Sequence, residues 1–252
     1  MNMTDSIRPR NVLLPASVIL GSSLIVSALI ASATFYRVRA LDATLQVTGS
    51  AKQQVKADTV KWTAGFTRTV SETELKSGYA KVAVDLKAVT KFFQDNGVDS
   101  KEITISPVFL EPNYQYGYPP SEDGQSRREY TLRQTVEVQS PDVDKVTALA
   151  KNVAAITDAG VIFSTQSLEY FYVKLPELRV TLLKDAVRDA EARAKAIAES
   201  GGRRVGTLKA ASVGVVQVLP VNSVEITDYG TYDTSKIDKE VMVTVRATFG
   251  LK

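Results

Sequence analysis

Residues 178–202 read LRVTLLKDAVRDAEARAKAIAESGG, and this stretch decides the fold class of the chain. Small and apolar residues recur in it at steps of four and three, the spacing that aligns side chains along one stripe of an α-helix. The predicted stripe consists of Leu183, Val187, Ala190, Ala194 and Ile197. Charged residues occupy most other positions, and two glycines follow where a helix commonly ends. The sequence therefore predicts one long helix, and its alanines allow the element packed against it to approach closely.

Strand patterns surround this helix in the sequence. Apolar and polar residues alternate over residues 60–70 and again over residues 241–249, as in strands with one face against a core. A short strand is expected at residues 45–49, followed by a polar turn at residues 51–56. A long helix among strands usually covers a sheet. We therefore expect an α+β protein with mainly antiparallel sheets covered by long helices.

The elements predicted for residues 60–173 follow the order strand, helix, strand, strand, helix, strand. Ser71 and Glu74 form a capping-box pattern before the first helix. Ser140 is the predicted cap of the second helix, with Pro141 in its first turn and an apolar stripe over residues 143–156. The apolar seam of the first helix would also suit a coiled coil, but its place between strands favours a helix on a sheet. The order is that of a ferredoxin-like βαββαβ unit. We expect two lobes that share a core, within one domain at residues 41–252.

Residues 1–40 precede that domain and contain an uncharged, mostly apolar run that begins at Val12 and ends at Phe35. The run is long enough to cross a bilayer as a helix, and arginines flank it on both sides. Its length favours an uncleaved anchor over a signal peptide, whose apolar core is shorter. The small residues around Ala33 resemble a cleavage site, so cleavage there stays open as the alternative. The expected topology is a short cytoplasmic tail, one membrane-spanning helix and a C-terminal domain outside.

Composition excludes several kinds of chemistry. The chain has no histidine and no cysteine, which removes the commonest general base, thiolate nucleophiles and zinc–cysteine sites. A net charge of +3 is too small to indicate a nucleic-acid partner. One polar segment holds four acids without the spacing of an EF-hand, namely Glu225, Asp228, Asp233 and Asp238. We therefore expect no enzyme activity, no metal site and no cofactor. A hydrolase with an atypical site is the least favoured alternative.

A long segment between two predicted strands is the candidate binding element. Residues 111–128 are too many for a simple hairpin, and loops of this length are often functional. The segment contains Tyr114, Tyr116 and Tyr118, and tyrosine is enriched in binding surfaces. These three residues are the predicted partner-binding residues. The alternative is a surface loop whose tyrosines lie against their own sheet.

Four stretches in this order and spacing resemble the SIMPL-domain family of bacterial envelope proteins. They are LQVTGSA at residues 45–51, TVEV at 135–138, DAVRDAEARA at 185–194 and KEVMVTV at 239–245. The resemblance implies a two-lobed, extracytoplasmic, non-enzymatic α+β domain. Some members of the family are similar to subunits of ring-like assemblies, and some are associated with oxidative-stress defence. The family has no established catalytic motif, so the resemblance implies no site residues.

Together these observations predict a single-pass protein of the bacterial inner membrane with its C-terminal domain in the periplasm. We expect it to form a homo-oligomer and to act as an assembly or interaction module of the cell envelope. The alternative function is a module that binds a ligand or protein partner through the tyrosine segment.

Overall fold

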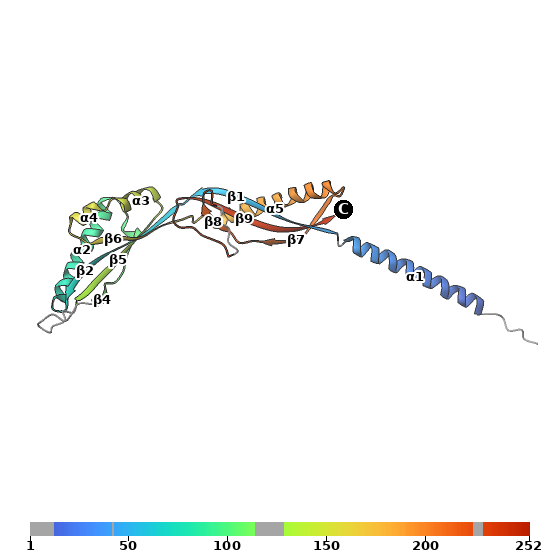
Figure 1. Ribbon diagram of the computed structural model, residues 1–252, viewed down its shortest axis with the longest axis horizontal. Coiled ribbons are helices and arrows are strands. Elements are labelled where there is room, and N and C mark those ends of the chain that lie inside the picture. Colours follow the sequence, from blue (N-terminus) through green and yellow to red (C-terminus); the bar gives the residue numbers. More distant parts are fainter. Residues whose placement is uncertain (1–12, 42, 114–128, 224–228) are drawn as a thin grey trace, which may run out of the picture. The chain divides into compact units, whose positions relative to one another are not determined.

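The computed structural model describes residues 13–41, 43–113, 129–223 and 229–252 (Figure 1). The chain divides into two compact units. The first comprises the chain up to Ser50 together with residues 186–213 and 245–252. The second comprises residues 51–185 and 214–244. Each unit is described by itself below.

The second unit contains a five-stranded antiparallel sheet. Its strands are β2 (Thr59–Ser71), β3 (Ile103–Ile105), β4 (Phe109–Asn113), β5 (Glu129–Ser140) and β6 (Phe163–Phe171). The order is β3-β5-β2-β6, and β4 also pairs with β5. This is the ferredoxin-like arrangement expected from the order of the elements. Pro107 lies between β3 and β4, where it interrupts the edge of the sheet.

Helices cover one face of this sheet (Figure 1). They are η1 (Glu72–Glu74), α2 (Leu75–Asp95), η2 (Ser100–Glu102), α3 (Val143–Lys151) and α4 (Ala154–Asp158). Alternate β2 residues, including Trp62 and Phe66, are buried in the core under α2, α3 and α4. The Trp62 ring meets that of Phe93 from α2 edge to face, with centroids 5.3 Å apart. The helix α2 therefore covers a sheet, as predicted, and is not part of a coiled coil.

The second predicted helix of this unit is wrong in one respect, because the structure breaks it into α3 and α4. The Asn152 N–H donates to the Leu149 carbonyl, three residues back, which interrupts the α-helical bonding pattern. The helix also begins later than expected. Asp142 caps it by accepting from the Lys145 N–H at 3.2 Å, whereas the Ser140 hydroxyl accepts from the Asp142 N–H.

The other sheet has four strands, β1 (Thr44–Lys56), β7 (Val205–Val213), β8 (Gln217–Pro220) and β9 (Asp238–Leu251). Its order is β1-β9-β7, and β8 also pairs with β9. The helix α5 (Leu175–Ser200) contributes buried side chains to it. The turn predicted at residues 51–56 is wrong, because β1 continues to Lys56 as an edge strand with mostly exposed side chains. Polar residues are tolerated there because little of either face is buried.

The helix α5 confirms the opening prediction, although three of the five predicted stripe residues lie next to a buried position and not on it. The buried positions recur strictly every four residues: Leu178, Leu182, Ala186, Ala190, Ala194 and Ala198. Of the predicted stripe, Leu183 and Val187 are half-buried and Ile197 is exposed. In the first unit Ala190 and Ala194 pack with Val47, Ala247 and Phe249.

Within the second unit the buried apolar side chains form two separate clusters, so the expected shared core is wrong here. One cluster lies under α2, α3 and α4 and includes Trp62 and Phe93. The other joins the first turns of α5 to β8 and β9 and includes Leu178, Leu182, Val218, Val241 and Val243. Each sheet thus packs against its own helices around a separate cluster.

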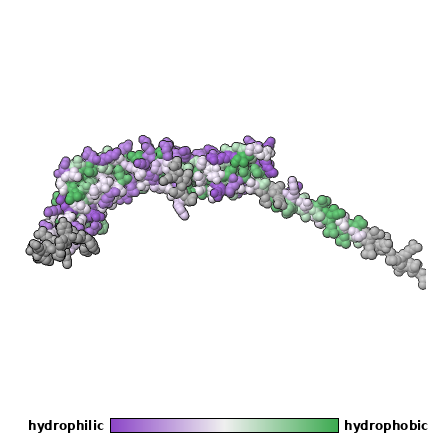
Figure 2. All heavy atoms as spheres, in the orientation of Figure 1, coloured by the Kyte–Doolittle hydropathy of each residue, from purple (hydrophilic) through white to green (hydrophobic). Residues whose placement is uncertain are grey.

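The helix α1 (Leu13–Leu41) precedes β1. Its segment Pro15–Val38 is long and apolar enough to cross a membrane, and none of it is buried within the protein. Figure 2 shows this helix as a mainly hydrophobic surface. The finding supports the predicted membrane anchor or signal sequence. The first residue of the predicted run, Val12, lies outside the described residues.

Candidate functional site

The free edge of β7 is the first candidate surface, and it belongs to the first unit. This strand pairs with β9 on one side, and no strand among the described residues pairs with its other side. The Gly214 N–H donates to the Thr244 carbonyl of β9 at 2.9 Å. Successive residues of a strand direct their backbone groups to opposite sides. The N–H and C=O groups of Ala211 and Val213 therefore point away from β9, toward the open edge.

The side chains of β7 are also unusually exposed for an apolar strand. All its residues from Thr207 to Val213 are exposed, including Leu208 at 46% and Val213 at 53%. Leu208, Ala211 and Val213 are in register with the buried β9 residues Phe249, Ala247 and Val245, so they lie on the core face of the sheet. Lys209 is the single charged residue of the strand. Proteins usually protect such edges, which makes β7 a candidate for pairing with another strand.

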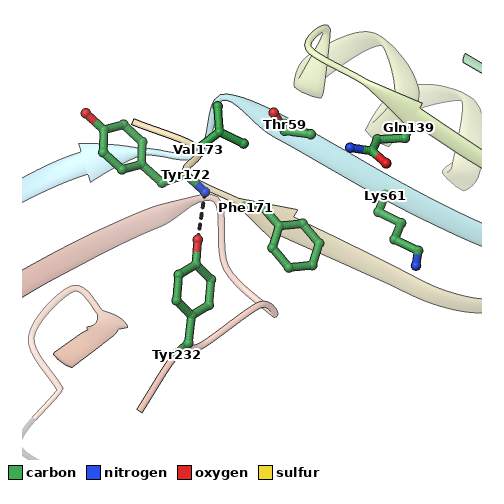
Figure 3. Close-up of a pocket in the computed structure, with 7 residues that line it drawn as sticks. All are labelled: Thr59, Lys61, Gln139, Phe171, Tyr172, Val173 and Tyr232. Atoms are coloured by element: carbon green, nitrogen blue, oxygen red, sulfur yellow. Dashed lines mark hydrogen bonds between the residues drawn. The ribbon is translucent and has the colours of Figure 1, made fainter. Parts of the chain in front are cut away.

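A cavity of about 400 Å³ in the second unit is the other candidate site. Its walls come from the ends of β2, β5 and β6 and from the segment before β9. The lining residues are Thr59, Lys61, Gln139, Phe171, Tyr172, Val173 and Tyr232. Figure 3 shows the ring of Phe171 between Tyr232 on one side and Lys61 on the other. The Phe171 and Tyr232 rings stack with centroids 6.1 Å apart and planes inclined by 29°.

Backbone hydrogen bonds hold the wall that carries Tyr232. The Tyr232 hydroxyl accepts a hydrogen bond from the Tyr172 N–H at 2.8 Å (Figure 3). On either side of it, the Asp233 N–H donates to the Val218 carbonyl, and the Val218 N–H donates to the Thr231 carbonyl. The Thr234 carbonyl accepts from Tyr170 of β6 at 2.8 Å. Tyr232 is therefore fixed against β6 and β8, and the cavity does not depend on a freely moving side chain.

A buried lysine supports the same wall from inside. Lys239 is fully buried, and its ammonium lies 5.7 Å from the centre of the Tyr232 ring, a cation–π contact. The ammonium also donates to the Asp233 carbonyl. Burial lowers the pKa of Lys239, and the nearby Asp233 charge opposes this. For Asp233, burial acts to raise the pKa, but hydrogen bonds from Ser235 and the charge of Lys239 outweigh it, so the pKa is lowered.

Asp58 fixes the opposite wall. Its N–H donates to the Phe171 carbonyl at 2.9 Å, and its Oδ1 accepts from the Val173 N–H at 2.8 Å. These bonds set the position of two lining residues at the point where β6 ends. The Oδ2 atom of Asp58 is buried without a hydrogen-bond partner among the described residues.

Lys61 is the cationic group that lines the cavity. It forms an ion pair with Glu137 of β5, with Nζ and Oε2 3.0 Å apart. Both side chains are about one-third exposed, at 34% and 33%. They lie on the face of the sheet opposite the helices, since the flanking β2 residues Val60 and Trp62 are buried. The lining therefore offers stacking surfaces together with an amine, an amide and a hydroxyl group, a combination suited to binding.

The predicted partner-binding residues Tyr114, Tyr116 and Tyr118 lie outside the described residues, so that prediction stays a prediction. The cavity residues were not predicted as a site. Phe171 belongs to a predicted strand and Tyr232 to a polar segment, and the sequence alone carries no signal that brings them together. Among the described residues, no three acidic side chains gather to hold a metal ion.

A model of the SIMPL family, described as a protein of unknown function (DUF541), matches residues 45–249. The match covers most of the chain and includes both sheets, the β7 edge and the cavity. None of the curated proteins matches the chain.

Proposed function

Because the chain belongs to the SIMPL family, we propose that it is a non-enzymatic, membrane-anchored assembly module of the cell envelope. In this proposal α1 stays in the bacterial inner membrane and residues 41–252 lie in the periplasm. Copies of the chain associate with one another through the outer edge of β7. A contribution to oxidative-stress defence is an expectation from the family resemblance alone.

The open edge of β7 is the observation that carries the proposal. Its outward backbone groups and exposed apolar side chains match what a second β-strand provides, namely hydrogen-bond partners and an apolar cover. The strand contains no acidic residue and no proline, so little opposes pairing. The bulges near its start leave residues 210–213 as the regular stretch for contact. Anchoring in one membrane would also raise the local concentration of copies.

The substitution Ala211→Pro tests this proposal. Proline removes an N–H that points outward while leaving the bonds to β9 intact, and edge strands tolerate proline at such positions. We expect the full chain to lose its oligomers and to keep its circular dichroism spectrum. Native mass spectrometry of the protein extracted from membranes in detergent measures the number of copies.

The matched control is Ala211→Ser, which keeps the N–H and should keep the oligomer. A monomeric wild-type chain, or an unchanged copy number in a folded Ala211→Pro variant, would contradict assembly through β7.

A further inference from the structure

We infer that the cavity beside Phe171 and Tyr232 binds a small aromatic anion, such as an aromatic carboxylate. The inference is independent of self-assembly, because the cavity lies in the second unit and the β7 edge lies in the first. A volume of about 400 Å³ lies at the lower end of the range for small-molecule sites. The lining therefore suits a ligand of one or two fused rings.

The rings of Phe171 and Tyr232 indicate a planar, apolar ligand body. Their planes are inclined by only 29°, so the two rings stack on each other. Aromatic pairs favour offset stacking, and a ligand ring can extend such a stack. Val173 adds an apolar contact beside these rings and is itself exposed. The Tyr172 N–H donates to the Tyr232 hydroxyl and the Val173 N–H donates to Asp58 Oδ1. These bonds hold the walls in place, so the surface exists before a ligand binds.

Lys61 indicates the charge of the ligand. It is the one charged side chain among the lining residues, and Gln139 and Thr59 beside it offer further hydrogen-bond donors. Glu137 pairs with Lys61 but does not line the cavity. The ammonium has three N–H donors, so it can bind a ligand carboxylate while keeping its bond to Glu137. A carboxylate beside Lys61 and a ring beside Phe171 would use both parts of the lining.

The ion pair of Lys61 and Glu137 allows a test with two substitutions that should change the affinity for an anion in opposite directions. Replacing Lys61 by glutamine removes the cation and leaves Glu137 unpaired, which should weaken binding of an anion. Replacing Glu137 by glutamine removes the competing carboxylate, which should strengthen it. A neutral ligand of the same shape should respond to neither change, because it stacks on the rings without needing the charge.

The probes are 2-naphthoate and its neutral analogue 2-naphthamide. Isothermal titration calorimetry of the full chain in detergent, with a titration into detergent alone subtracted, gives the dissociation constants. We expect Lys61→Gln to weaken 2-naphthoate binding by about tenfold, the scale of one hydrogen bond to a charged group, and Glu137→Gln to strengthen it. Binding of 2-naphthamide should change less than about twofold in both, because this ligand carries no charge for the pair to act on.

Val173→Ser tests the apolar wall and should weaken both ligands, and its exposed position keeps the risk to folding small. Lys91→Gln, which breaks an exposed ion pair on α2, is the control and should change neither ligand. The inference is overturned if wild-type protein binds neither probe, or if the two probes respond equally to Lys61→Gln. Thermal unfolding of each variant establishes that it is folded, and the copy number measured for Ala211→Pro has no bearing on this result.

Discussion

At the scale of single residues, a partly buried ion pair links β2 to α2. Arg68 donates two hydrogen bonds to the Asp85 carboxylate, at 2.6 and 2.7 Å, and a third to the Gly160 carbonyl at 2.8 Å. Asp85 is buried, and the Arg68 side chain is 28% exposed. The bonds to Asp85 raise the pKa of Arg68, although its own desolvation opposes this. Arg68 therefore stays charged, and its guanidinium group depends on Asp85 for two of its three hydrogen bonds.

We predict that Asp85→Ala destabilises the protein by about 3 kcal/mol, because it leaves a partly buried guanidinium group without its carboxylate. The double variant Arg68→Met/Asp85→Leu should lose less stability than Asp85→Ala alone, since no unpaired charge remains. Urea unfolding followed by the fluorescence of Trp62, the single tryptophan, reports on this cluster directly.

The exposed pair of Lys91 and Asp95 on the same helix is the control for that prediction. Their charged atoms are 2.9 Å apart, but both side chains are largely exposed. Asp95→Ala should therefore change the free energy of unfolding by less than about 0.5 kcal/mol. Equal losses for Asp85→Ala and Asp95→Ala would show that burial does not set the strength of the Arg68 pair.

The role of Asp85 could not be predicted from the sequence. The helix period aligns Val82, Leu86 and Val89 along one apolar stripe, and an aspartate beside them reads as a solvated residue. Its partner Arg68 shares the alternate positions of Trp62 and Phe66, so the pattern places a charge on the core face of the strand without showing what pairs with it. Only the packing of α2 on β2, a tertiary contact, brings the two charges together.

At the scale of the elements, the close contact between β1 and α5 depends on small residues. A Cβ atom on Gly49 would lie within 3.0 Å of the Ala186 carbonyl oxygen and of the Ala190 N and Cβ atoms. Next to it, the Ser50 N–H donates to the Asp189 carboxylate at 2.8 Å. The strand and the helix therefore touch backbone to backbone, which a glycine facing alanines permits.

We predict that Gly49→Ala destabilises the first unit by about 3 kcal/mol, because backbone atoms of α5 must move to accept the new methyl group. The matched control is Thr48→Ala, whose side chain is exposed on the other face of β1. Thermal unfolding followed by circular dichroism measures the difference. If the two variants unfold at the same temperature, the helix moves away from the strand at little cost, and the close contact does not stabilise the unit.

The helix α5 illustrates how far pattern reasoning extends. Its existence, its end near Gly201 and the close packing of its alanines followed from spacing and composition. The exact stripe did not, because alanines occupy several faces and hydrophobicity alone cannot rank them. Leu183 and Ile197 were placed on the predicted stripe because they are large and apolar. The structure instead buries every fourth residue, and two of these residues, Ala186 and Ala190, are small enough to lie against Gly49.

At the scale of the whole molecule, local patterns predicted the order of the elements and hence the ferredoxin-like sheet. They did not predict the cavity, because its aromatic residues Phe171 and Tyr232 meet only when the segment before β9 packs against the end of β6. Nor did they predict the open edge as β7 in particular. Which strand ends a sheet depends on pairing between distant segments, and alternation within one strand carries no information about this.

The proposed topology makes a prediction that the absence of cysteine renders simple to test. A single cysteine is introduced either at Lys195, whose side chain is 57% exposed on α5, or at Ser6 in the N-terminal tail. A membrane-impermeant maleimide applied to intact spheroplasts should label Lys195→Cys at once and Ser6→Cys only after lysis, because the bilayer separates the two positions. Labelling of Lys195→Cys only after lysis would place the domain in the cytoplasm and contradict the proposal. Recovery of a shortened Ser6→Cys chain that has lost its cysteine would show instead that the segment is cleaved near Ala33, and assembly through β7 would then have to proceed without an anchor.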